Sequence, residues 1–337
     1  MKRMNIPTFL PRFFAFALLF AIVPMSANAQ VTEEAMETTD VETEEVSVPA
    51  PENASAANAE ARTEFGGAIE AAQAANELAT AEGFIQAADH YLSAAEIAMN
   101  SGDSELEARV TDVKSNASKA YVNAGSAYSE ADDIAAAAAQ FERAAEIAKE
   151  IDDTEFGAKT YYNAGVAYVT AEDYPAALTA LDAAIEMAPD NLDYYYVRGV
   201  ALNKSGDAEA SEAALMELAE RAETAEDAAM ATKARETVGK GYLSAAYADL
   251  QGGRFSAAVA GLDKAAPFFA EDDATLNTLY ANSYYKLGVE QVQAERFDTA
   301  QRSLQRAQTH ARLAGKDAIV NGAQAQLDYI AQVQAQG

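Results

Sequence analysis

Two histidines are the residues best suited to acid–base or metal chemistry at neutral pH, and the chain contains no cysteine. Without a thiol there is no sulfur nucleophile, no disulfide and no thiolate metal site. His90 and His310 lie far apart in the sequence, and nothing in the pattern brings them together. A surface or packing role explains each histidine better, so we predict neither a catalytic nor a metal-binding site.

Sequence motifs of known catalytic centres are also absent. The chain has no G-x-S-x-G, no glycine-rich phosphate loop, no H-E-x-x-H and no twelve-residue calcium loop. Acidic runs such as residues 271–273 are more typical of a solvated loop than of a metal site. We therefore predict that the protein is not an enzyme and that it binds no cofactor.

The net charge of −29 indicates which partners are disfavoured. Such a field repels nucleic acid and anionic lipid surfaces. It favours a basic partner, divalent cations or a saline habitat, or it serves solubility alone, and these interpretations stay open. Apart from the first residues, no stretch is apolar enough to cross a bilayer, so we predict no stable membrane insertion. Nothing in the sequence indicates the oligomeric state.

Residues 1–29 have the three-part pattern of a secretory signal peptide. A basic start precedes an apolar run at 13–23, and the Ala-Asn-Ala of residues 27–29 offers small side chains for cleavage before Gln30. As a helix the run spans only about 17 Å, against a hydrocarbon core of about 30 Å, which disfavours a membrane anchor. We predict a cleaved signal and a periplasmic or secreted protein.

The next segment, residues 30–64, is strongly acidic. It contains ten acidic residues, with Arg62 as its single cation, and Pro49 and Pro51 interrupt it. A stretch without apolar periodicity cannot bury enough surface to offset its ordering entropy. We therefore predict an acidic disordered linker, with helix beginning near Glu60.

Residues 65–316 repeat one arrangement of small and bulky side chains. The clearest unit, 158–191, has two segments of helical period joined by a turn at 171–174. A small residue recurs on the first segment of each unit as Ala75, Gly125, Gly165, Gly199, Ala246 and Gly288. Four positions earlier stand Ala71, Tyr121, Tyr161, Tyr195, Tyr242 and Tyr284. Helices approach closely where side chains are small, so we expect Gly165 and Ala177 to be in close contact.

In spacing, and in the 34-residue length of the clearest unit, this pattern resembles the tetratricopeptide repeat family. The proline that closes the second segment, Pro189, fits the resemblance. The resemblance implies an all-α, right-handed superhelical solenoid of about six helical hairpins. Residues 317–337 follow as a C-terminal capping helix, because a solenoid end needs a polar-backed helix to cover its core.

The resemblance also implies that the first helices line a concave surface that binds a protein or peptide. From the third unit onward the positions expected to face this groove are apolar or tyrosine, which suits a binding surface. The predicted peptide-binding groove consists of Tyr162, Val166, Val169, Tyr196, Val200, Tyr247, Leu250, Tyr285 and Val289. The competing interpretation is that these tyrosines contact neighbouring units.

Some members of the family hold a peptide's terminal carboxylate with a clamp of Lys, Asn and Arg. Asn76, Asn123 and Lys159 match three clamp positions, but Ala72 and Asn163 stand where Lys and Arg are needed. We therefore do not predict a carboxylate clamp. The predicted function is an exported, non-enzymatic scaffold for a protein or peptide. The alternative is a small-ligand binding component of an envelope uptake system, which a closed pocket with converging polar groups would favour.

Overall fold

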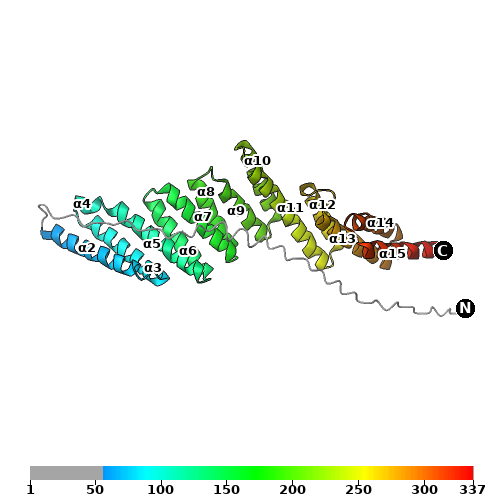
Figure 1. Ribbon diagram of the computed structural model, residues 1–337, viewed down its shortest axis with the longest axis horizontal. Coiled ribbons are helices and arrows are strands. Elements are labelled where there is room, and N and C mark those ends of the chain that lie inside the picture. Colours follow the sequence, from blue (N-terminus) through cyan, green and yellow to red (C-terminus); the bar gives the residue numbers. More distant parts are fainter. Residues whose placement is uncertain (1–55, 337) are drawn as a thin grey trace.

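The computed structural model describes residues 56–336, and every regular element in that range is helical. Successive helices pack against one another in chain order and build an elongated solenoid (Figure 1). The prediction of an all-α solenoid of helical hairpins is confirmed. The predicted signal peptide and residues 30–55 of the predicted linker lie outside the described residues.

Six hairpins follow one another within the described residues, and we number them as units one to six, each with a first and a second helix. The pairs are α2 (Ala56–Asn76) with α3 (Ala81–Asn100), α5 (Val110–Glu130) with α6 (Ile134–Glu150), α7 (Thr154–Thr170) with α8 (Tyr174–Met187), α9 (Leu192–Lys204) with α10 (Ala208–Thr224), α11 (Ala228–Gln251) with α12 (Phe255–Ala265), and α13 (Ala274–Gln293) with α14 (Phe297–Leu313). Three further elements are α4 (Ser104–Glu107) between units one and two, the 3-10 turn η1 (Ala266–Phe268) after α12, and α15 (Asp317–Gln336), which packs against α13 and α14.

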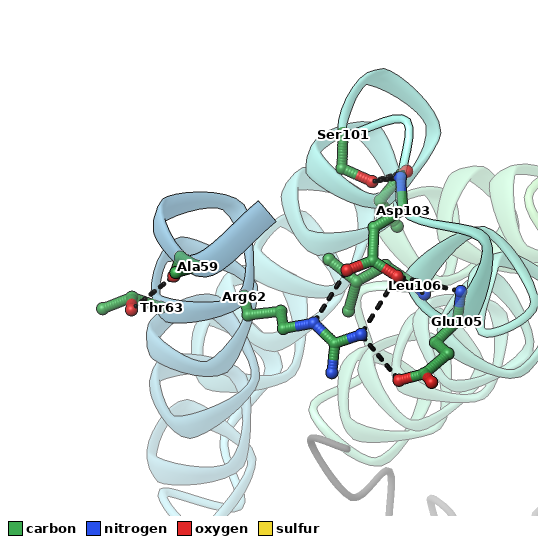
Figure 2. A network of polar contacts seen from close by, with 8 residues as sticks. Ala59, Arg62, Thr63, Ser101, Asp103, Glu105 and Leu106 are labelled. Atoms are coloured by element: carbon green, nitrogen blue, oxygen red, sulfur yellow. Dashed lines mark hydrogen bonds and ion pairs between the residues drawn. The ribbon is translucent and has the colours of Figure 1, made fainter. Parts of the chain in front are cut away.

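Helix α2 begins at Ala56, so residues 56–64 of the predicted linker are helical. The reason is a long-range contact that the local composition does not reveal. The Arg62 guanidinium donates to the Asp103 carboxylate at 2.7 and 3.1 Å and to Glu105 at 2.6 Å (Figure 2). The neighbouring Phe65 is fully buried. Because Arg62 and Phe65 anchor α2 to the array, residues 56–64 are part of the array and not of a disordered linker.

The connections that lead into α6, α7, α8, α10 and α11 repeat one short geometry. An aspartate caps the following helix by accepting a hydrogen bond from a backbone N–H, as Asp173 does from Ala176 at 3.2 Å. The residue before the cap has a positive φ, for example +62° at Glu172. This left-handed residue ends one helix, and an aspartate cap stabilises the start of the next by about 1 kcal/mol. Helices joined by such short turns must run antiparallel.

In units two, three, four and six a glycine of the first helix lies under a large side chain of the second. A Cβ built on Gly165 would be 2.6 Å from Cγ of Leu181, and one on Gly288 would be 2.7 Å from Cγ of Leu304. The expected contact between Gly165 and Ala177 stays a prediction, and in unit four the equivalent pair does meet, since the Ser211 hydroxyl donates to the Gly199 carbonyl at 2.9 Å. Leu181 itself occupies the space that a Cβ at Gly165 would need, so the close approach pairs small with large.

Neighbouring units are joined by a polar contact that recurs along the array. A tyrosine hydroxyl of a first helix donates to a carboxylate on the preceding second helix: Tyr121 to Asp89 at 2.7 Å, Tyr168 to Glu142 at 2.5 Å, Tyr242 to Glu212, and Tyr280 to Asp263 at 2.8 Å. Between units three and four Arg198 donates to Asp182 instead, at 2.5 Å. Burial raises the pKa of Tyr121 to about 12, and the Asp89 carboxylate adds to this increase. These tyrosines therefore remain protonated donors at neutral pH.

Candidate functional site

The predicted groove is largely filled by contacts between units. Of its nine residues, five expose 8% or less of their surface, namely Val166, Val169, Tyr196, Val200 and Leu250. The other four are half-buried, namely Tyr162, Tyr247, Tyr285 and Val289. Five of the nine positions are therefore largely inaccessible to a ligand, and peptide binding at this groove stays a prediction.

The physical reason is that the first helices of successive units pack on these side chains. Tyr162 stacks on Tyr194 of α9 with ring centroids 4.9 Å apart. The Tyr196 hydroxyl lies 3.2 Å from the Thr237 hydroxyl of α11, and the Lys233 ammonium lies 4.1 Å from the Tyr196 ring centroid. Tyr162 and Tyr196 therefore contact neighbouring units, as the competing interpretation proposed.

The fourth unit reverses two predicted roles. Tyr195 was expected in the core and Tyr196 in the groove. In the structure Tyr196 is 8% exposed, whereas Tyr195 is half-buried. The Tyr195 hydroxyl donates to the Pro189 carbonyl at 3.0 Å, and the Arg221 guanidinium lies 4.8 Å from the Tyr195 ring centroid. Both contacts are at the surface, so Tyr196 contributes more of the core.

Polar side chains recur at two positions on the first helices of units one to three. They stand two residues before or one residue after the close-contact residue of each first helix, and these two positions share one side of a helix because they are three apart. We call them the polar strip, which consists of Asn76 on α2, Asn123 and Ser126 on α5, and Asn163 on α7. In unit four the same two positions are Val197 and Val200, so neither is polar there.

The polar strip contains buried oxygen atoms that have no hydrogen-bond partner within residues 56–336. They are Oδ1 of Asn76, Oγ of Ser126 and Oδ1 of Asn163. Asn163 as a whole is only 5% exposed. A buried polar atom left unpaired costs about 1–3 kcal/mol, so the strip is destabilising unless ordered water or a ligand supplies the missing donors. Sequence reasoning named Asn76, Asn123 and Asn163 only as part of an incomplete clamp and missed this property.

Two lysines accompany the polar strip. Lys119 and Lys159 each stand one helical turn before a strip asparagine, Asn123 and Asn163 respectively. Lys159 is exposed and Lys119 is half-buried. The same Lys-x-x-x-Asn spacing thus occurs on the first helices of two successive units. In a chain with a net charge of −29, this places two positive charges beside hydrogen-bonding groups.

The histidines do not form a site together. His90 is exposed on α3, whereas His310 on α14 stacks on Tyr280 with centroids 4.4 Å apart. The His310 Nδ1 lies 2.7 Å from Asn277 Oδ1, and the Asn277 amide nitrogen donates to two backbone carbonyls, so His310 must donate from Nδ1. Burial lowers the pKa of His310, and the nearby Arg306 charge lowers it further. His310 is therefore a neutral packing residue.

Neither a metal-binding cluster nor a membrane-spanning helix occurs within residues 56–336. That range holds no group of three or more His, Cys, Asp or Glu side chains that could bind a metal ion. No helix of the same range has the length and apolar character needed to span a membrane.

Comparison with known proteins places a tetratricopeptide repeat at residues 116–190, which include most of α5 and all of α6 to α8. No curated protein matches the chain. Among solved structures, YrrB, described as a TPR protein with an unusual peptide-binding site, is 21% identical, with 61% of this chain and 91% of YrrB covered and a TM-score of 0.31. The Rap protein complexed with competence and sporulation factor is 16% identical, with 81% and 76% covered and a TM-score of 0.32. The TPR2AB domain of yeast Sti1 is 17% identical, with 80% and 99% covered and a TM-score of 0.27.

Proposed function

Since residues 116–190 match the tetratricopeptide repeat, we propose that the chain is a non-enzymatic scaffold that binds a protein or peptide along the polar strip of units one to three. One observation carries the proposal. Three buried oxygen atoms at repeated positions of α2, α5 and α7 have no partner among the described residues. A bound polypeptide would supply the missing donors from its backbone N–H groups.

The side chains of the strip can turn toward such a ligand without unfolding the array. The terminal torsion of an asparagine is broad, so rotation at Asn76 or Asn163 moves Oδ1 toward the surface. The Ser126 hydroxyl can accept from an N–H or donate to a carbonyl. By contrast, Val166 and Val200 in the predicted groove are stiff at χ1 and have no polar atom to offer. The polar strip is therefore the better binding surface.

The chemistry beside the strip also bears on the partner's charge. The net charge of −29 would suit a basic partner if it does more than keep the chain soluble, whereas Lys119 and Lys159 favour acidic side chains at this face. Opposite charges within a few ångströms attract most strongly in low salt. We expect a peptide bound at the strip to be acidic or neutral, and a basic partner to bind at another surface.

Selection of peptides from a random library on the full chain tests the proposal. Each selected peptide is then measured by calorimetry against the unchanged chain, the Asn76→Ala/Asn163→Ala variant, and the control Asn321→Ala on the exposed side of α15. Truncation of interface side chains that matter costs about 1–2 kcal/mol, which corresponds to roughly 5- to 30-fold weaker binding. Equal affinities for all three proteins would show that binding does not involve the strip.

We also propose that the chain is exported and that the mature protein begins at Gln30. The pattern of residues 1–29 supports this, since a basic start, a short apolar run and small residues at 27–29 are typical of cleaved signals. Mass spectrometry of the protein from its native host should find an N-terminus at or near Gln30. An intact N-terminus in a cytosolic fraction would overturn the proposal.

A further inference from the structure

The acidic segment that precedes the array has the chemistry that the polar strip requires. Residues 30–55 contain eight acidic residues and no lysine or arginine. Lys119 and Lys159 can pair with carboxylates, and the buried Oδ1 of Asn163 can accept from a backbone N–H. An acidic polypeptide offers both kinds of group at once.

The position of the segment allows it to reach the strip. It joins the array at Ala56, the first residue of α2. Lys119 is the tenth residue of α5 and Lys159 the sixth residue of α7, so both lie in the first half of their helices. Twenty-six residues span up to about 85 Å when extended. Packed helix axes lie about 10 Å apart, so the four steps from α2 to α7 cover about 40 Å.

Covalent attachment compensates for the weakness of exposed ion pairs. A single exposed pair contributes little because water and salt screen it. A segment tethered to the same molecule, however, has an effective concentration on the order of millimolar at a site within its reach. Several weak contacts at that concentration favour a bound segment at low salt.

We propose that residues 30–55 dock on the polar strip of their own chain, through their carboxylates on Lys119 and Lys159 and their backbone on the strip asparagines. Docking places a covalently attached competitor on the face of units one to three. That the competition regulates partner binding rests on the proposed function, whereas the docking itself does not.

Distance measurement between two spin labels tests the docking directly. The chain has no native cysteine, so Thr38→Cys and the exposed Thr154→Cys at the start of α7 receive the only labels. Pulsed electron resonance should give a short, narrow distance distribution in low salt. The distribution should shift to longer and broader distances in 1 M salt and in the Lys119→Gln/Lys159→Gln variant.

A control variant separates docking from a general effect of charge. Lys149→Gln/Lys316→Gln also removes two positive charges, but from the end of α6 and from the turn before α15. This variant should leave the distances unchanged. Neutralising the segment instead, with Glu42→Gln, Glu44→Gln and Glu45→Gln, should release it without touching the array. If the distances do not respond to salt, to the lysine variant or to the neutralised segment, or if the control shifts them equally, the segment does not dock on the strip.

Discussion

Replacement of Gly165 by alanine should destabilise the third unit, although alanine is the better helix former. A Cβ at this position would lie 2.6 Å from Cγ and 2.8 Å from Cδ2 of Leu181, and ordinary van der Waals contact begins near 3.4 Å. Leu181 is fully buried, so it cannot simply swing into solvent. Overpacking of this kind costs about 1–3 kcal/mol. The gain in helix propensity, up to about 1 kcal/mol, offsets only part of that cost.

Gly67→Ala in α2 is the matched control, because a Cβ there meets nothing within 4 Å. It should show the propensity gain alone, so the two variants should differ by about 1–3 kcal/mol. Urea unfolding combined with hydrogen exchange of α7 and α8 is the appropriate assay, since repeat arrays open in local units. Gly165→Ala should cease to be unfavourable in a Leu181→Ala background, where the obstructing side chain is gone. If Gly165→Ala is as stable as Gly67→Ala, or if its cost persists without Leu181, the inferred contact is wrong.

Three further outcomes can be checked on the same protein. Tyr196→Ala should lower the free energy of unfolding in urea by about 3–5 kcal/mol, because Tyr196 is only 8% exposed. Tyr195→Ala should cost less, and the opposite order would restore the sequence-based assignment of the two tyrosines. The hydrogen bond from Arg62 lowers the pKa of Asp103, so the stability that this pair adds is present above about pH 3.9 and is lost as pH falls through the folded-state pKa. Thermal melts at decreasing pH should show this loss in the unchanged chain and not in Asp103→Asn. Burial lowers the pKa of His310, so the midpoint of its NMR titration should fall below about 6.5. The stability that neutral His310 contributes should be lost as pH falls through that midpoint. A midpoint at or above about 6.5 would contradict the buried geometry.

The fold was predictable because it depends on a local pattern repeated six times. Small and bulky residues at fixed spacing define two helices and the side on which they meet, whatever the rest of the chain does. The pattern therefore predicted the hairpins and a final helix starting at Asp317. It also located Asn76, Asn123 and Lys159 on first helices, since a helix has one register once its packing side is known.

Tertiary structure decided how one unit meets the next, and with it which side chains remain accessible. The pairing of Arg62 with Asp103 across 41 residues orders the start of α2, although the local composition there favours disorder. Tyr196 meets Thr237 across 41 residues, so a tyrosine expected on a surface is buried. Such contacts depend on the rotation between units, which sums many small packing terms and leaves no periodic trace in the sequence. Among residues 56–336 the oxygens of Asn76, Ser126 and Asn163 have no hydrogen-bond partner, a property that became visible only in three dimensions.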